Sequence, residues 1–232
     1  MKECPILFST PMIQAILEGR KIQTRRVVRR PDIFSDKAWF NSIPHNTTET
    51  SYKIAYLKVP YDELKDVSGY RIICPYGQVG DRLWVKETFK HYANKWDGTE
   101  WKSCITYKAG NVTLYDSWDK NEPPREKWWN KSTILDQWQP SIFMPRWASR
   151  ITLEITDIRV ERLNSISYDD VIAEGVSKEM GLKFGFASPY PEDKYLLMLA
   201  RHIYVALWDS INGKKHSWES NPFVWVIEFR KI

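Results

Sequence analysis

A short basic segment near the N-terminus contains the residues best suited to chemistry. Six positive charges and no acidic residue lie between Gly19 and Arg30, more than the net charge of +5 that 34 basic and 29 acidic residues give the whole chain of 232 residues. Such a segment is suited to face an anion, most naturally the phosphates of nucleic acid, although a solvated charged loop is the alternative. Its basic residues are Arg20, Lys21, Arg25, Arg26, Arg29 and Arg30.

Within this segment Lys21 is followed three positions later by the hydroxyl of Thr24. A lysine beside a Ser or Thr hydroxyl can activate that hydroxyl as a nucleophile without a histidine. The lysine must then be neutral for part of the time, which partial burial or the nearby charges of Arg20, Arg25 and Arg26 would favour. Because Lys-x-x-Thr is frequent by chance, the spacing alone permits this chemistry but does not establish it.

A second group combines positive charge with an aromatic ring at Arg146, Trp147 and Arg150. This combination suits contact with phosphates and stacking on bases, whereas core packing is the commoner role of a single Trp. Glu87 follows a predicted strand over residues 81–86 and could line a cleft. A surface ion pair with a neighbouring Lys is the interpretation that we favour for Glu87.

Local signals predict a two-turn helix that places the basic segment. Pro5 to Ser9 is a short apolar strand, Thr10 is a suitable N-cap, and Pro11 suits the first helical position. Gly19 is suited to the left-handed residue that ends the helix. The residues after Gly19 are therefore expected at a defined place.

Residues 150–162 give the clearest strand pattern, but their apolar residues change face between Ile155 and Ile158. A bulge or sharp bend near Thr156–Asp157 would realign the two halves, as in small barrels. A short helix is expected next, because Ser167 and Asp170 resemble a capping box, with Ile166 and Val171 as a hydrophobic staple and Gly175 as its end.

A longer helix is predicted from about Glu192 to Ile211, ended by Asn212-Gly213, and a final strand over residues 223–229. The helix is expected to bury Leu196, Ala200, Ile203, Leu207 and Ile211. Short strands in the majority with few helices predict one mixed α+β domain over residues 1–232, built on a small β-barrel with insertions. Insertions are expected near residues 31–70, 90–140 and 177–190, and the Trp-rich second one is expected to be loops pinned by aromatic rings.

The composition argues against several other classes of protein. Aromatic residues make up 14% of the chain, which argues against disorder, and the longest apolar runs are far shorter than a membrane span. The three cysteines and four histidines show neither a CxxC pair nor an HExxH motif, so no metal and no cofactor is expected. Without a signal-peptide pattern, a cytoplasmic location is the expectation.

The segment Gly19-Arg20-Lys21-Ile22-Gln23-Thr24-Arg25-Arg26 resembles the G-x-K-x-x-T-x-R signature of the ASCH domain family. The resemblance continues through Gly80 to Val85, Arg150 to Val160, the helix over residues 166–175 and the final strand. With its insertions and the stretch from Met144 to Arg150, the chain is most similar to larger members encoded by phages and prophages. Ile22 departs from the Thr that is frequent at that position of the family.

This resemblance implies a PUA-like β-barrel with short flanking helices and a cleft that binds RNA or nucleotides in a bacterial cytosol. A small bacterial member of the family removes the acetyl group from N4-acetylcytidine with a Lys, a Thr and a Glu. The motif carries these roles to Lys21, Thr24 and Glu174. A hydrolase of modified nucleosides is therefore expected, with two alternatives: a non-catalytic RNA- or nucleotide-binding module, or a ribonuclease, for which the chain offers no informative pair of histidines.

Overall fold

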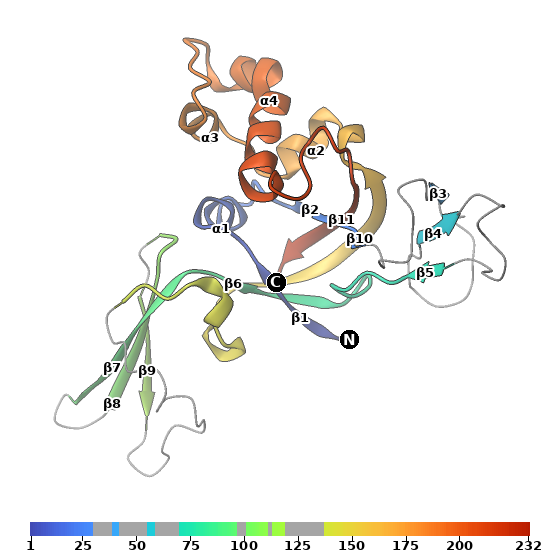
Figure 1. Ribbon diagram of the computed structural model, residues 1–232. Helices are drawn as coiled ribbons and strands as arrows, with labels where there is room; N and C mark the ends of the chain where they lie inside the picture. The colour runs from blue at the N-terminus through green and yellow to red at the C-terminus, as the bar shows by residue number, and fades with distance from the viewer. Residues whose placement is uncertain (30–38, 42–54, 59–69, 97–100, 111–112, 119–136) are drawn as a thin grey trace.

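A five-stranded sheet lies at the centre of the protein in the computed structural model, with the helices gathered on one side of it (Figure 1). The mixed α+β class expected from the sequence is confirmed. The structure describes residues 1–29, 39–41, 55–58, 70–96, 101–110, 113–118 and 137–232.

The strand order of this sheet is β1-β6-β10-β11-β2. Only β1 and β6 are parallel, and every other neighbouring pair is antiparallel. The strands are β1 (Glu3–Leu7), β2 (Gln23–Val27), β6 (Arg82–Lys86), β10 (Thr152–Arg162) and β11 (Phe223–Lys231). The basic segment thus enters the sheet as an edge strand beside the C-terminal strand.

The predicted irregularity in the long strand β10 is confirmed. Its register against β11 shifts between Ile155 and Asp157, and the two halves then bury Leu153, Ile155 and Ile158 in one core. A bulge adds one unpaired residue and restores the inward face after the change of parity.

The sheet stays open along its edges β1 and β2, because among the described residues no ladder of backbone hydrogen bonds joins them. The two edges are nevertheless bridged by a side chain. Arg26 Nη2 on β2 donates a hydrogen bond of 2.6 Å to the carbonyl oxygen of Leu7, at the end of β1. The Arg26 guanidinium also lies 5.1 Å from the ring centroid of Phe8. The described sheet is therefore curled but is not a closed barrel.

The helices are α1 (Thr10–Leu17), α2 (Tyr168–Ala173), α3 (Lys178–Lys183) and α4 (Glu192–Asn212). The predicted N-cap Thr10 is instead the first residue of α1, and Ser9 is the N-cap, so Pro11 occupies the second position. Pro lacks an N–H that the first turn would leave unpaired anyway, so either position tolerates it. The predicted capping box of Ser167 and Asp170 at α2 is present in both directions.

The prediction for the buried face of α4 is confirmed for Ala200 and Ile203, whereas Leu196 and Leu207 are half-buried against the same core and the prediction is wrong for Ile211. The helix buries Tyr195, Ala200, Ile203, Tyr204 and Trp208, while Ile211 is exposed. Tyr and Trp bury most of their rings while their polar atoms find partners, so the apolar face contains them as well as the aliphatic residues. This face packs in a second core with Val171 and the strand β11.

The expected insertions contain more regular structure than the sequence predicted. The 90–140 region was expected to be loops, but β7 (Phe89–Trp96), β8 (Trp101–Tyr107) and β9 (Thr113–Trp118) form a three-stranded antiparallel sheet. In the region 31–70 and just beyond it, the described residues form a second small sheet of β3 (Trp39–Asn41), β4 (Ala55–Lys58) and β5 (Tyr70–Ile72). Figure 1 shows the two small sheets at separate ends of the central one. Residues 30–38, 42–54, 59–69, 97–100, 111–112 and 119–136 lie outside the described residues.

Candidate functional site

The end of α1 and the end of α2 meet at Lys21 and Glu174. A backbone bridge pairs these two residues, and Ile22 N donates 2.9 Å to Ala173 O. Lys21 Nζ donates to Glu174 Oε2 at 2.6 Å and to the Glu174 carbonyl oxygen at 2.9 Å. The start of the basic segment therefore lies beside the end of the helix that carries Glu174.

Two glycines shape this meeting point. Gly19 has φ +75° and ends α1, with Arg20 N donating to Ala15 O and Gly19 N to Ile16 O, as in a Schellman motif. Gly175 ends α2 with φ +84°, and a Cβ there would stand 2.9 Å from Lys21 Cβ and 3.0 Å from Ala15 Cβ. Glycine at 175 thus permits both the turn and the close approach of the two helix ends.

The lysine and the carboxylate are both buried, with side chains 0% and 4% exposed. Burial lowers the pKa of Lys21 below its usual value, and the positive charges of Arg26 and Arg25 act in the same direction, while the Glu174 carboxylate opposes them. Lys21 therefore loses its proton more readily than a surface lysine. Burial thus shifts the pKa of Lys21 in the direction that lysine-assisted chemistry requires.

Thr24 lies on β2 opposite Ile227 of β11 and is buried. It lines the same pocket as Glu174, whereas Lys21 is not among the lining residues. Within the described chain, Lys21 Nζ hydrogen-bonds to Glu174 and not to Thr24. Of the three predicted catalytic residues, Lys21 and Glu174 are thus in contact, and Glu174 and Thr24 line one pocket.

The pocket has a volume of about 930 Å³ and lies between β2 and α4. That volume falls in the usual range for sites of small organic ligands. Around Thr24 and Glu174 its wall includes Arg26, Tyr76 and Tyr204. Burial raises the pKa of Tyr204 well above its usual value, and the charge of Glu174 adds to this effect, so its hydroxyl keeps its proton at neutral pH.

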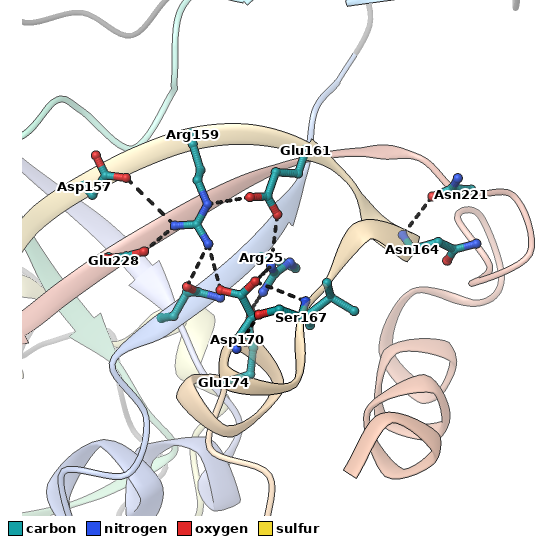
Figure 2. Close-up of polar contacts among 12 residues, drawn as sticks. Arg25, Asp157, Arg159, Glu161, Asn164, Ser167, Asp170, Glu174, Asn221 and Glu228 are labelled. Atoms are coloured by element: carbon teal, nitrogen blue, oxygen red, sulfur yellow. Dashed lines mark hydrogen bonds and ion pairs between the residues drawn. The ribbon is translucent and has the colours of Figure 1, made fainter. Parts of the chain in front are cut away.

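Arg25 is buried and lines the pocket, and its guanidinium lies within a network of carboxylates (Figure 2). Its Nη2 lies 3.1 Å from Asp170 Oδ2 and 3.2 Å from Glu161 Oε2, and its Nη1 lies 3.5 Å from Glu174 Oε1. Arg25 therefore links Glu174 to the N-terminal turn of α2 and to β10. Of the basic residues predicted to bind substrate, Arg25 instead holds the protein's own carboxylates.

Arg159 is the second cation of this network, and sequence reasoning missed it. It lies 2.6 Å from Glu161 Oε1 and 2.8 Å from Asp170 Oδ1, and it also pairs with Glu228 of β11 (Figure 2). Asp170 thus caps α2 and binds both arginines at once. These contacts fix the segment that ends at Glu174.

Of the remaining predicted binding residues, Arg26 lines the pocket and the others do not. Arg20 pairs with Glu18 and donates 3.2 Å to Gly175 O. Arg146 pairs with Glu3 at 2.8 Å, and Trp147 is 44% exposed. Neither these residues nor Arg150 line the pocket, so the expected surface around Arg146 is separate from the site at Glu174.

The expectation of a surface ion pair between Glu87 and a Lys is wrong. Glu87 is buried, and its partner is Arg150. Arg150 Nε and Nη2 donate to the two Glu87 oxygens at 2.8 and 2.9 Å, and Nη2 also donates 2.7 Å to Ala109 O. The guanidinium lies 4.3 Å from the ring centroid of Tyr107. This group holds β8 against the end of β6.

Tyr76, Tyr204 and Trp208 are pocket residues that the sequence analysis did not single out. A signal was present for two of them: Ala200, Tyr204 and Trp208 recur every fourth residue, which places them on one face of a helix. The predicted buried face of that helix contains aliphatic residues alone, so it leaves these two aromatic residues out. Tyr76 sits in a turn, where no periodicity could indicate it.

No family model, curated protein or solved structure matches this chain. The described part of the chain contains no group of His, Cys, Asp and Glu side chains arranged to hold a metal ion. Among the same residues, no helix is both long and apolar enough to cross a membrane. Functional inference therefore depends on the motif residues and on the geometry around them.

Proposed function

We propose that this chain is an ASCH-type protein with a PUA-like fold whose pocket hydrolyses the amide of an acylated nucleoside such as N4-acetylcytidine. The observation that carries the proposal is the buried Lys21–Glu174 pair, 2.6 Å between Nζ and Oε2, beside a pocket that Thr24 also lines. The curled sheet, with edges bridged by Arg26, supports the barrel-like part of the proposal. The signature spacing of Lys21 and Thr24 supports the family assignment.

In the proposed reaction the Thr24 oxygen attacks the carbonyl carbon of the acetyl amide. The hydroxyl proton passes to the Lys21–Glu174 pair, in which burial lowers the pKa of Lys21. The C–N bond then breaks, the proton is returned through Glu174 to the leaving amine, and the acetyl group remains as an ester on Thr24. Water hydrolyses this ester, so that amide and water become amine and acetate.

The negative oxygen of the tetrahedral intermediate needs a hydrogen-bond donor. The backbone N–H groups of Arg20 and Lys21 donate to Ala15 O, and that of Ile22 donates to Ala173 O, so these groups already have partners. Arg26 lines the pocket, and its buried Nε has no partner in the described structure. Arg26 is therefore the donor that we assign to the oxyanion.

A non-catalytic nucleotide- or RNA-binding module is the second candidate. It is favoured by one observation, namely that Lys21 Nζ hydrogen-bonds to Glu174 rather than to Thr24. Such a module would bind acylated and unmodified nucleosides without turnover. Its affinity for single-stranded RNA would fall steeply with salt, because basic residues release condensed counterions.

The deciding experiment measures release of cytidine from N4-acetylcytidine by the full chain, with and without a strong chelator. We expect turnover in both conditions, since the proposed steps use only Thr24, Lys21, Glu174 and water. Thr24→Ala should lower turnover by about a thousandfold, whereas the matched variant Thr152→Ala, on β10 outside the pocket, should retain it. Binding without turnover by the wild-type protein would favour the second candidate.

Full activity of Thr24→Ala would exclude the covalent step and leave a water activated by the Lys21–Glu174 pair. No turnover of any acylated nucleoside by a folded wild-type protein would overturn the hydrolase proposal. Circular dichroism and a denaturation curve of each variant separate loss of chemistry from loss of fold.

A further inference from the structure

A second surface lies outside the pocket, on two short 3-10 helices where the chain passes from β6 to β7 (Figure 1). These are η2 (Ser141–Phe143) and η3 (Arg146–Ala148). Ile142, Phe143 and Trp147 are 61%, 69% and 44% exposed, and none of them lines the pocket. Large apolar side chains exposed close together are typical of interaction sites.

The two exposed rings are carried by an anchored backbone. Met144 and Ala148, which directly follow Phe143 and Trp147, are buried in a small core with side chains of β7 and β8. The Tyr107 hydroxyl also donates 2.7 Å to Ala148 O. The backbone beside each ring is thus fixed before a ligand binds, which lowers the entropic cost of binding.

Positive charges lie directly beside these helices. Lys86 Nζ donates to Ile142 O and lies 5.4 Å from the ring centroid of Trp84. The Arg146 guanidinium lies 6.0 Å from the same centroid. Trp84 and Lys86 belong to the face of β6 opposite the buried residues of that strand. These contacts connect the cations of β6 and η3 to one aromatic ring.

The same arrangement recurs at Trp138, just before η2. Lys90 Nζ and Lys108 Nζ lie 4.9 and 5.9 Å from the ring centroid of Trp138. A backbone bridge between Gln139 and Phe89 places this segment against the start of β7. A cation is attracted to the face of an aromatic ring, so each of the two Trp rings orients two cations.

Rings and cations together form a surface that we call the aromatic strip. Within the described residues, the only carboxylate that an ion pair joins to its cations is that of Glu3, 2.8 Å from Arg146. The field along the strip therefore favours an anionic partner. The strip consists of Trp84, Lys86, Lys90, Lys108, Trp138, Phe143, Arg146 and Trp147.

Single-stranded nucleic acid is the anionic partner that uses both features of the strip. Its unpaired bases stack on aromatic rings while its phosphates contact cations. An acidic peptide would meet the cations but would bring no regular series of flat rings. A second copy of the chain would place the same positive surface against itself across a two-fold axis. Phe143 and Trp147 lie within about 14 Å along the chain, so a short oligonucleotide can reach both.

We propose that the aromatic strip binds single-stranded RNA, with bases stacked on Phe143 and Trp147 and phosphates against Lys86, Lys108 and Arg146. The choice of RNA over DNA rests on the proposed function, in which the pocket takes a ribonucleoside. The binding of a single strand at the strip does not depend on that function.

The test measures binding of a fluorescently labelled uridine dodecamer to the full chain by anisotropy. Phe143→Ala and Trp147→Ala should each weaken binding about tenfold, because a base loses the ring on which it stacks. Leu197→Ala, which removes an equally exposed apolar side chain from α4, is the matched control and should leave the affinity unchanged.

The salt dependence of binding separates the cations from the rings. Lys108→Ala should reduce the slope of log affinity against log salt by about 0.7, because one phosphate contact is lost. Phe143→Ala should weaken binding without changing this slope. Lys183→Ala, which removes an exposed cation from α3, should change neither the affinity nor the slope.

Unchanged affinity in both ring variants, or no binding of the dodecamer by the wild-type protein, would overturn the proposal. Equally tight binding of an RNA duplex or of polyglutamate would also overturn it, because charge alone would then explain the affinity. A DNA dodecamer should bind no more tightly than the RNA, and clearly tighter binding would overturn the choice of RNA. A dimer that Phe143→Ala dissociates would assign the strip to a contact between two copies.

The strip and the hydrolase fail separately. Free N4-acetylcytidine is too small to need the strip, so Phe143→Ala should retain its hydrolysis. Strand binding that depends on Phe143, without hydrolysis of any acylated nucleoside, supports the strip and overturns the hydrolase. Hydrolysis without measurable strand binding supports the hydrolase and overturns the strip.

Discussion

Glu174 and Glu87 are both buried carboxylates with a cationic partner, yet their surroundings differ. Both carboxylate oxygens of Glu87 accept hydrogen bonds from Arg150. Arg150 also donates to a backbone carbonyl and lies over the ring of Tyr107. The Glu174 carboxylate has one short contact, to Lys21, and within the described part of the chain its other oxygen has only the 3.5 Å contact to Arg25. Glu174 lines the pocket between β2 and α4, and Glu87 does not line that pocket.

The difference teaches that burial and pairing alone do not mark a functional carboxylate. An arginine fork holds a fixed charge and cannot lose its proton at ordinary pH, so the Glu87 pair can only stabilise structure. A lysine can release its proton when burial lowers its pKa, so the Glu174 pair can move a proton. Access to a ligand and a titratable partner distinguish the second carboxylate from the first.

Matched isosteric variants should separate the two sites by the largest margin. Glu174→Gln should lower turnover of N4-acetylcytidine by about a hundredfold or more, because the amide can neither take up nor return the proton. Glu87→Gln should keep the turnover of the folded protein, since Glu87 does not line the pocket. Comparable losses in both variants, with both folded, would contradict the distinction.

Among these variants, Arg150→Ala should have the largest effect on the free energy of unfolding. Arg150→Ala leaves the Glu87 carboxylate buried without a partner, which should cost about 3–5 kcal/mol of unfolding free energy. Chemical denaturation measures this cost. Arg146→Ala, which removes an exposed partner of Glu3, is the control and should cost less than about 1 kcal/mol. An equal cost for the two variants would show that the Glu87 group does not stabilise the fold.

Two glycines with positive φ give a smaller and more local test of the Glu174 site. Gly19→Ala should cost about 1 kcal/mol, because it strains only the backbone and its Cβ meets nothing within 4 Å. Gly175→Ala should cost about 2 kcal/mol or more, because its Cβ also meets Lys21 and Ala15. Thermal denaturation ranks the two variants. A larger loss for Gly19→Ala would contradict the close approach at Lys21.

The alkaline pH dependence of stability should have opposite signs at the two sites. Burial, aided by the charge of Glu87, raises the pKa of Tyr107 from 10.0 to about 12. Unfolded Tyr107 then loses its proton first, so its contribution to stability falls as pH rises from 10 to about 12. The lowered pKa of Lys21 makes the unfolded state bind more protons below pH 10.5, so this contribution rises with pH up to that value.

Tyr107→Phe should therefore remove a fall in unfolding free energy above pH 10, and Lys21→Met should remove a rise below pH 10.5. Urea denaturation of each variant and of the wild-type protein across this range measures both slopes. If neither substitution changes its slope, the two side chains do not titrate differently in the folded and unfolded protein.

Local signals predicted the parts of the fold that depend on neighbouring residues. The parity change in β10 indicated its bulge, and Ser167 with Asp170 indicated the start of α2, because both depend on residues a few positions apart. The sheet β7–β9 was missed because its polar sequence resembles loops. Its pairing across strands is not visible from any single strand.

The residues of the candidate site also include some that the sequence indicated and some that it did not. The motif resemblance placed Lys21, Thr24 and Glu174 together, and the structure confirms the contact of the first with the third. The role of Arg25 in a carboxylate network could not be predicted, because Glu161, Asp170 and Glu174 reach it from 136 or more positions away in the chain. Arg159 was missed for the same reason, since its partners include Glu228 of another strand.

A crystal structure of the Thr24→Ala variant with N4-acetylcytidine tests the central claim most directly. The account predicts the ligand in the pocket between β2 and α4, with its acetyl carbonyl facing position 24 and its exocyclic nitrogen beside Glu174. A ligand bound outside this pocket, or bound within it with its acetyl group directed away from both residues, would contradict the account.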